Sequence, residues 1–438
     1  MARPGVDRQF ALLFMVMLTI AAGNTALQSV LPALGRSLNV PDSAVGAAFS
    51  VSALLWVLAA PFWANRSDRH GRRRMVIVGM WGFVVSLTVC GLFLLAGING
   101  WIGGTAAFAA FVAGRVIYGS FGSAAPPAIQ AIVAGRTTRE QRTKALTLLG
   151  SAFGLGTILG PAVAPYLVLG AIGAVTVGLS GPAFIAAIFG VFMLLWVVKS
   201  LDDDTPDPHT HGAANAYPSI GGQSTGASVT AAAAEAPEQA ERIGYLDPRV
   251  RAWMICGLVM GHGQAMTGQA IGFLVIDRMN LPPEQAIQPT GLVLIMGALA
   301  ALLVQWGIIP ILNLGPRRLM LAGLAVAAAG CAATGTATSL YGIATGYALA
   351  SMGFGLARPG FTAGSSLAVP QAAQGSVAGK VTSVNGASFV LGPSIGIGLY
   401  EMWQPLPYLT AAAGMLVLLA FAFMSLPSGL AESASREQ

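Results

Sequence analysis

Three ionisable side chains, Arg115, His262 and Arg358, lie deep inside long runs that are otherwise free of charge. An arginine in such a run can hold an anionic or hydrogen-bond-accepting group of a ligand. A histidine, whose unperturbed pKa is about 6.5, can take up and release a proton near neutral pH. These residue types indicate ligand binding and proton transfer, and we find no plausible catalytic triad or nucleotide-binding loop beside them.

Amide side chains occur in the same kind of apolar run. Asn24 and Gln28 are one helical turn apart, and Gln269 follows His262 by two turns, so each pair falls on one helix face. The predicted cavity residues are Asn24, Gln28, Arg115, His262, Gln269 and Arg358. Two other interpretations stay open, because arginines can brace helix ends by bonding carbonyl groups and amides can tie helices together.

Carboxylates that could carry a proton are scarce inside the apolar runs. All 17 acidic residues fall in expected loops or near the ends of runs, and the nearest are Asp277 and Glu401. We therefore expect His262 to be the proton carrier, with Asp277 and Glu401 as alternatives. A histidine that only packs and hydrogen-bonds between helices remains an equally good interpretation of His262.

The composition decides which solvent surrounds these residues. Of 438 residues, 55% are hydrophobic and 9% are charged, whereas a soluble domain carries about 25% charged residues. Such a chain excludes a soluble enzyme, a nucleic-acid-binding domain and a disordered protein. The three cysteines lie far apart in apolar runs, so we expect neither disulfides nor a metal site.

The apolar runs predict twelve membrane-spanning helices, since a span requires about 20 apolar residues. The run from Phe10 to Gly35 is too long for a signal peptide and is the first span. The predicted spans are 10–34, 44–64, 74–97, 105–134, 145–169, 176–199, 252–276, 287–312, 318–337, 340–368, 381–402 and 407–426.

A polar stretch separates the sixth and seventh spans. Residues 200–248 are rich in Gly, Pro, Ala and Ser and have almost nothing to bury, which predicts a flexible linker. The chain then divides into an N-terminal lobe, 1–199, and a C-terminal lobe, 249–438. Most of the 23 Lys and Arg residues fall on one side if the N-terminus is cytoplasmic. The positive-inside rule therefore predicts that the linker and both termini are cytoplasmic.

The two lobes share an internal repeat. Gly71-Arg72-Arg73-Arg74-Met75 after the second span corresponds to Gly315-Pro316-Arg317-Arg318-Leu319 after the eighth. Ile158-Leu159-Gly160-Pro161 in the fifth span corresponds to Val390-Leu391-Gly392-Pro393 in the eleventh. The shared order predicts one six-helix unit used twice, which is an all-α membrane protein with two pseudo-symmetric lobes.

These motifs resemble the major facilitator superfamily, and within it the twelve-helix drug:proton antiporters. The segment from Ala64 to Arg74 is similar to the loop signature G-x-L-x-D-R-x-G-R-R-R. The matching positions are Asp68, Arg69, Gly71, Arg72 and Arg73, while Ala64 and Arg66 depart from it. Arg115-Val116-Ile117-Tyr118-Gly119 is similar to a fourth-span signature. Gly156, Gly160 and Pro161 match the antiporter signature of the fifth span, although its last two glycines are Ala164 and Pro165 here.

The resemblance implies roles for these residues. Asp68 and the arginines would latch the two lobes at the cytoplasmic side, or they could merely enforce positive-inside topology. Gly156, Gly160 and Pro161 would seal the fifth helix against the eighth, or they could serve close packing alone. The first, fourth, seventh and tenth helices would line a central cavity. Antiporters of this kind commonly hold a carboxylate in a membrane helix of the N-terminal half, and this chain has none.

The resemblance predicts a secondary transporter and not an enzyme. We expect it to export a small amphipathic compound, such as an antibiotic, in exchange for protons across the inner membrane by alternating access. The alternative is a proton-coupled symporter or a uniporter for an anionic metabolite, with Arg115 and Arg358 as its ligands. A third possibility is a sensor on the same scaffold that transports nothing. We expect a monomer in contact with membrane lipids, without cofactor, metal or nucleic acid.

Overall fold

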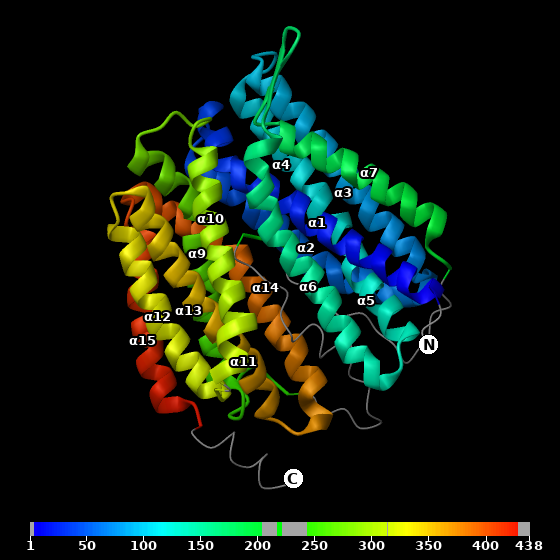
Figure 1. Ribbon diagram of the computed structural model, residues 1–438, viewed down its shortest axis with the longest axis vertical. Helices are drawn as coiled ribbons and strands as arrows, with labels where there is room; N and C mark the ends of the chain where they lie inside the picture. The colour runs from blue at the N-terminus through cyan, green and yellow to red at the C-terminus, as the bar shows by residue number, and fades with distance from the viewer. Residues whose placement is uncertain (1–3, 204–216, 221–242, 313, 428–438) are drawn as a thin grey trace.

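The computed structural model describes residues 4–203, 217–220, 243–312 and 314–427. Helices form two bundles, which lie on opposite sides of Figure 1. The first bundle, the N-lobe, holds α1 (Pro4–Ser37), α2 (Asp42–His70), α3 (Arg72–Ile98), α4 (Gly104–Phe121), η1 (Gly122–Ala124), α5 (Ala125–Arg136), α6 (Arg139–Val163), η2 (Ala164–Leu167) and α7 (Gly181–Ser200). The second, the C-lobe, holds α9 (Arg251–Met279), α10 (Ile287–Leu302), η3 (Leu303–Ile308), α11 (Ile309–Leu312), α12 (Pro316–Thr336), α13 (Leu340–Leu367), α14 (Gln371–Met402) and α15 (Leu406–Ser425).

The twelve predicted spans are confirmed as helical units. The fourth consists of α4, η1 and α5 in series, and the eighth of α10, η3 and α11. Within the described ranges, ten helical segments are long and apolar enough to cross a membrane by length and composition. The helices α9 and α14 are not among these ten, although both are longer than 25 residues. Both carry several Gly, Gln, Ser or Thr residues that pack against other helices.

The repeat seen in the sequence corresponds to equivalent positions in the two lobes. The helix α3 begins directly after Gly71, and α12 begins directly after Gly315. In the N-lobe α6 packs on α1, and in the C-lobe α14 packs on α9. Each lobe therefore packs its fifth helix against its first, and the two-lobe prediction is confirmed.

A short β-hairpin joins the fifth helical unit of the N-lobe, α6 with η2, to the sixth, α7, and the sequence did not predict it. Strands β1 (Leu169–Ile172) and β2 (Val175–Gly178) pair antiparallel, and Gly173 turns the chain with a φ of 63°. The side chain of Asn99 donates to the carbonyl of Thr176 and accepts from its N–H, both at 2.8 Å. The hairpin protrudes from the upper end of Figure 1. The predicted span 176–199 therefore begins later than expected, at Gly181.

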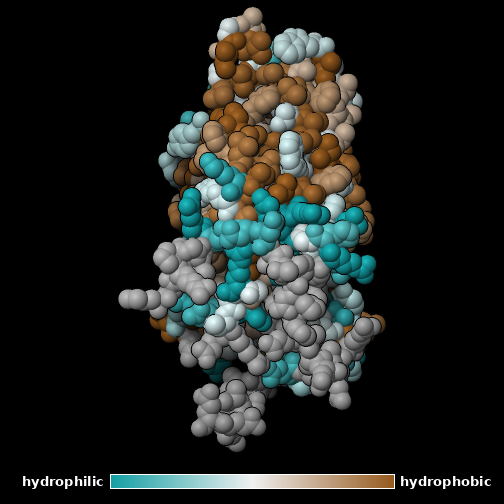
Figure 2. Space-filling view, turned by 90° about the vertical axis from the view of Figure 1, so that its right-hand side faces the viewer, coloured by the Kyte–Doolittle hydropathy of each residue, from teal (hydrophilic) through white to brown (hydrophobic). Residues whose placement is uncertain are grey.

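The outer surface matches a membrane environment. Large apolar side chains of α7, among them Ile188, Phe192 and Leu195, are more than half exposed. Figure 2 shows a broad apolar region over the upper part of the molecule, bounded below by a hydrophilic belt. Exposed apolar surface on this scale is stable in lipid and not in water.

The lobes meet through α2 and α14. A Cβ at Gly46 of α2 would lie 3.2 Å from the side chain of Ile397, so this glycine permits a close approach of the two helices. The hydroxyls of Ser50 and Ser394 hydrogen-bond across the same contact at 2.7 Å. In Figure 1 the lobes lie close together at the upper end and diverge toward the lower end, where the chain termini lie.

Four linker residues contradict the expectation that residues 200–248 have almost nothing to bury. Tyr217, Pro218, Ser219 and Ile220 are all buried, with only 2% of Tyr217 exposed. Tyr217 and Ile220 belong to the same cluster of buried apolar side chains as the N-lobe helices. The composition did not predict the burial of this segment, because its apolar residues are few and are flanked by long polar stretches.

Candidate functional site between the two lobes

Arg115 of α4 is the centre of a polar cluster in the N-lobe. The guanidinium is 1% exposed and lies against the ring of Tyr118, 4.6 Å from its centroid. Its Nη2 donates to the side-chain oxygen of Asn24 at 2.5 Å, to the hydroxyl of Tyr217, and to Ser52 at 3.4 Å. Its Nε and Nη1 have no hydrogen-bond partner among the described residues. Arg115 therefore has N–H groups left for a ligand.

Asn24 and Gln28 lie on the same face of α1, as their spacing predicted. Both side chains donate to the carbonyl oxygen of Pro218, at 2.5 Å and 3.1 Å. The side-chain oxygen of Gln28 accepts from the N–H of Ile220 at 3.1 Å. These two amides therefore bind a carbonyl oxygen and a neighbouring N–H group through hydrogen bonds.

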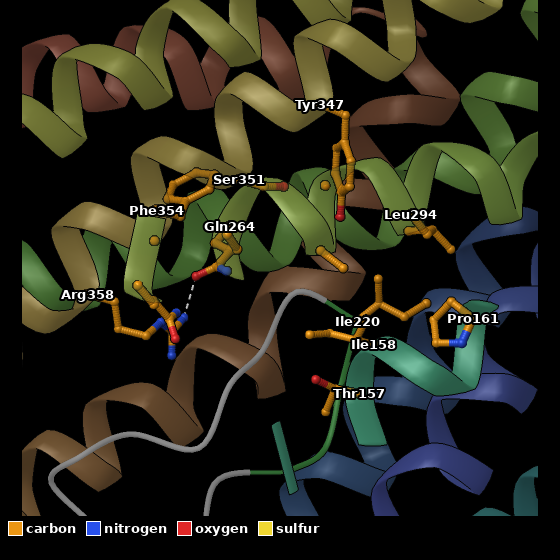
Figure 3. A pocket seen from close by; sticks show the side chains of 15 residues that line it. Thr157, Ile158, Pro161, Ile220, Gln264, Leu294, Tyr347, Ser351, Phe354 and Arg358 are labelled. Carbon is orange, nitrogen blue, oxygen red and sulfur yellow. Dashed lines mark hydrogen bonds between the residues drawn. The ribbon is translucent and has the colours of Figure 1, made fainter. Parts of the chain in front are cut away.

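The C-lobe repeats the pairing of a buried arginine with an amide. Arg358 of α13 is 6% exposed and donates to the side-chain oxygen of Gln264 on α9, and more weakly to Asn385 at 3.4 Å. Figure 3 shows Arg358 and Gln264 pointing toward each other. In both lobes, then, an arginine of the fourth helix bonds an amide of the first. No carboxylate pairs with Arg115 or Arg358 in the described part of the chain.

A cavity that is partly open to solvent lies between the lobes. The N-lobe contributes Thr157, Ile158 and Pro161 of α6, and the linker contributes Ile220. The C-lobe contributes side chains of α9, α10, η3 and α13, including Gln264, Tyr347 and Arg358. A cavity whose walls come from two bodies changes shape when those bodies move relative to each other.

The structure does not bring His262 to this site. Its Nδ1 lies 2.8 Å from the carbonyl oxygen of Leu258 in its own helix, and His262 does not line the cavity. It shares the face of α9 that carries Ile255 and Leu258, both about 40% exposed. In this conformation His262 lies outside the cavity lining, as do Asn24, Gln28, Arg115 and Gln269, and the cavity roles of these residues stay predictions. Gln269 is buried at 4% exposure, and its side-chain nitrogen has no hydrogen-bond partner among the described residues.

At the end of the bundle where α1 and α9 terminate, charged side chains join the lobes. Arg36 of α1 donates to both carboxylate oxygens of Asp277 on α9, and also to Asp42 in its own lobe. The hydroxyl of Tyr400 donates to Asp277 at 2.6 Å. Phe273 lies under the guanidinium, 5.4 Å from ring centroid to Cζ of Arg36. We call Arg36, Asp42, Asp277 and Tyr400 the Arg36 cluster.

Glu401 adds a second link at the same end. Its carboxylate accepts from the backbone N–H of Ser43 in the other lobe at 2.7 Å. Both predicted alternatives for the proton carrier, Asp277 and Glu401, therefore hold the two lobes together. In the described part of the chain, the direct hydrogen bonds between helices of the two lobes are those of Arg36, Ser43 and Ser50, all on the α1–α2 side.

The predicted cytoplasmic latch makes contacts within the N-lobe. Arg72 is buried and donates to the carbonyl of Ala131 on α5 at 3.2 Å. Arg73 pairs with Asp203 at 3.0 Å. Gly71, with a φ of 96°, turns the chain between α2 and α3. The side chain of Asp68 lies outside the described residues, and Arg69 is exposed. The described contacts of this loop therefore brace one lobe, and the latch between lobes stays a prediction.

The glycines of the fifth-span motif pack α6 on α1 and not on the eighth helix. A Cβ at Gly156 would lie 2.6 Å from the carbonyl oxygen of Leu18, and one at Gly160 would collide with Thr25. The contact with α10 is made instead near Pro161 and Pro165, which approach Gly291. Of the three motif residues, only Pro161 also lines the cavity.

Comparison with known proteins agrees with this architecture. The family model described as Major Facilitator Superfamily matches residues 13–313, more than half of the chain. The chain belongs to the major facilitator superfamily. Members of this family are transporters, which accounts for a wet cavity between two lobes in a membrane protein.

Individual relatives within the superfamily are distant. Multidrug resistance protein 2 of Bacillus subtilis is 28% identical over 38% of this chain and 38% of its own length. Tetracycline resistance protein, class B, of Escherichia coli is 27% identical over 42% and 41%. The chain thus matches about two fifths of the length of these curated relatives. A bacterial homologue of the human lysosomal transporter Spinster, inward-facing, shares the fold with a TM-score of 0.69 at 13% identity, covering 100% of this chain and 98% of that one.

The sequence analysis did not predict several residues of the site. Gln264 follows Gly263 as Asn24 follows Gly23, so a comparison of the two lobes at this point contained the signal. Arg36 follows the first predicted span, 10–34, and its sequence context indicates no partner for it. Tyr217 sits in the polar linker, and nothing in its sequence context indicates that it contacts Arg115.

Proposed function

We propose that this superfamily member exports a small amphipathic compound in exchange for protons by alternating access. The observation that carries the proposal is the cavity that both lobes line, together with a buried arginine-amide pair in each lobe and, among the described residues, a charged closure between the lobes at one end. Such a site can be exposed to either side by rocking the lobes about it. The resemblance to multidrug and tetracycline resistance proteins supports export.

We place the protein in the inner membrane with both termini on the cytoplasmic side. The basic ends of α2, α5 and α7 lie at the end opposite the Arg36 cluster, in agreement with the positive-inside rule. The lobes then comprise residues 1–199 and 249–438, with 200–248 between them. In this orientation the Arg36 cluster closes the outer end, and the conformation is inward-facing.

Asp277 is the carboxylate that we propose to couple protons to the movement. When ionised, it binds Arg36 of the other lobe and accepts from Tyr400. Protonation removes its charge and part of its hydrogen-bond acceptance, which weakens the outer closure. Asp42 remains to hold the Arg36 guanidinium after the lobes separate. Protons from outside would thereby favour the outward-open state, from which the substrate leaves. Exchange is completed when the lobes return and Asp277 releases this proton to the cytoplasmic side, which restores its bond to Arg36.

Reconstituted protein tests this function directly. A lumen two pH units more acidic than the medium stores about 2.7 kcal/mol per proton, so one-for-one antiport can concentrate substrate up to about 100-fold inside. We expect proteoliposomes to accumulate tetracycline or ethidium under this gradient, and to release them when nigericin collapses it. Protein-free liposomes are the control. Accumulation only under the opposite gradient would contradict export by antiport.

A second prediction concerns His262. Because it lies outside the cavity, we expect His262→Ala to retain gradient-driven transport within about twofold of the wild type, in line with substitutions away from functional contacts. Proton release on adding substrate should also be unchanged. If His262→Ala is expressed normally but no longer releases protons when substrate is added, His262 is the proton carrier and this prediction is wrong.

Symport or uniport of an anionic metabolite is the second candidate. It is favoured by Arg115 and Arg358, which have no carboxylate partner among the described residues. The direction of flux separates the two: a symporter would accumulate a carboxylated substrate when the medium, and not the lumen, is acidic.

A further inference from the structure

The linker residues Tyr217–Ile220 bind in the N-lobe cluster as a ligand would. Their partners lie on α1, α2 and α4, between 102 and 194 residues away in the chain. Holding one residue in a single backbone conformation costs about 1–2 kcal/mol. A buried segment of a polar linker must therefore offset this cost through specific contacts.

The Tyr217 hydroxyl and the Pro218 carbonyl make the polar contacts that identify this segment as a ligand. The Tyr217 hydroxyl accepts from Arg115 and donates to Ser52 at 3.2 Å. The Pro218 carbonyl accepts from both Asn24 and Gln28. Pro218 brings no N–H group that would have to be satisfied in this buried place. The site thus recognises a phenol and a nearby carbonyl oxygen.

The phenol ring of Tyr217 lies between aromatic neighbours. Trp56 meets it edge-on at a centroid distance of 5.8 Å, and Tyr118 does so at 6.0 Å. Edge-to-face contacts of this kind stabilise aromatic pairs beyond the burial of their area. The space between Trp56 and Tyr118 therefore fits a flat aromatic group, and the guanidinium of Arg115 lies within hydrogen-bonding distance of its hydroxyl group.

The segment leaves part of the site unused. Arg115 Nε and Nη1 are buried without a hydrogen-bond partner among the described residues, and so is the Ser219 hydroxyl. A buried N–H group without an acceptor is costly. A ligand that brings a further acceptor to Arg115 would satisfy groups that the linker does not.

We propose that Tyr217–Ile220 is a tethered occupant of a site formed by Asn24, Gln28, Ser52 and Arg115, and that the free ligands of this site are phenols that carry a carbonyl group. Binding of such a compound requires that the segment leave. The inference rests on the proposed function, because it names the substrate class of the transport site.

The tether gives the segment a large advantage over free ligands. A group linked through a short flexible chain has an effective concentration in the millimolar range. The affinity of a free ligand falls in proportion to the fraction of molecules whose site is empty. Variants that weaken the segment should therefore bind free ligands more tightly.

Binding of a free copy of the segment tests the proposal. The probe is the peptide acetyl-Tyr-Pro-Ser-Ile-amide, titrated by calorimetry into protein in nanodiscs. We expect tight binding to a variant in which residues 217–220 are replaced by Gly-Ser-Gly-Ser, and binding at least about tenfold weaker to the wild type, whose site is occupied. The peptide with Phe in place of Tyr should bind the variant about tenfold more weakly, because it cannot bond Arg115 or Ser52.

Matched substitutions place the binding at this site. In the Gly-Ser-Gly-Ser variant, Gln28→Ala should weaken peptide binding, because the peptide loses the two hydrogen bonds that Gln28 makes to this segment. In the otherwise unaltered chain, Tyr217→Phe should strengthen peptide binding, whereas Tyr245→Phe, at an exposed linker tyrosine, should not. Equal binding to wild type and variant, no binding to the variant, or no effect of Gln28→Ala would each overturn the proposal.

The same experiment separates this inference from the proposed function. Peptide binding is measured without a pH gradient and does not depend on export. If the peptide results hold but proteoliposomes show no proton-driven accumulation, export by antiport fails and the tethered occupant stands. If accumulation is seen but the peptide results fail, only the present inference is lost.

Discussion

Replacing Arg115 with methionine is expected to weaken transport about 10- to 100-fold at low substrate concentration while the protein still folds. Arg115 bonds Asn24, Ser52 and Tyr217 through one nitrogen and has further N–H groups directed at the site. Hydrogen bonds to a charged group contribute about 1.5–3 kcal/mol, so substrate affinity should fall about 10- to 100-fold. Methionine fills much of the same volume, which limits any cavity. The measurement is gradient-driven uptake of tetracycline or ethidium by proteoliposomes.

Arg317 provides the matched control for Arg115. It bonds the backbone carbonyls of Leu426 and Phe423 and lies over the Phe423 ring at 5.3 Å, and neither of these residues contacts Arg115 or lines the cavity. We expect Arg317→Met to leave substrate affinity near the wild-type value. Arg115→Lys should recover the charge but not the branched hydrogen bonding, and therefore only part of the activity. Wild-type transport by Arg115→Met would show that the site lies elsewhere.

Replacing Asp277 with asparagine should open the outer end of the protein. The substitution removes the charge that binds Arg36 across the lobes. Arg36 and Asp277 are partly buried, with side chains 24% and 20% exposed, and charge-assisted bonds in such a setting contribute about 1.5–3 kcal/mol. The closed population should therefore fall about tenfold or more relative to the open one.

Spin labels across the outer end measure this opening. Trp101 lies between α3 and α4 of the N-lobe, and Thr338 lies between α12 and α13 of the C-lobe; both are exposed. Electron-electron double resonance between labelled cysteines at these two positions should report a longer distance in Asp277→Asn. The control is Asp42→Asn, which removes a carboxylate from the same arginine but breaks no bond between lobes. Equal opening in both variants, or in neither, would contradict the role of Asp277 as an interlobe link.

The arginine-amide pairs give the internal repeat a chemical meaning. Arg115 bonds Asn24, and Arg358 bonds Gln264. The two arginines do not occupy equivalent positions in the sequence repeat, yet both reach the first helix of their own lobe. Among the described residues, the buried guanidinium of each lobe thus hydrogen-bonds an amide and pairs with no carboxylate. An uncompensated positive charge favours ligands with acceptor groups, which agrees with the phenol and carbonyl chemistry of the tethered segment.

The sequence by itself determined the membrane environment, the positions of the twelve spans and the repeat of the two lobes. These properties depend on the length and polarity of local runs, and on short motifs at helix ends such as Gly71 and Gly315. The pairing of Asn24 with Gln28 on one face was also predictable, because residues four apart in a helix share a face. Even the approximate place of Arg115 followed, since a charge in an apolar run must face a partner or water.

The tertiary structure alone decided which of these polar residues meet. The polar residues of α9 are not confined to one face, so no periodicity indicates that Gln264 faces the cavity and His262 does not. The contact of Arg36 with Asp277 depends on how closely the lobes approach, which the packing of α2 on α14 fixes. The burial of Tyr217–Ile220 depends on how α1, α2 and α4 pack together, because the polar partners of the segment lie on these three helices. Helix rotation and lobe contacts arise from many distant side chains acting together, and no local stretch of sequence contains them.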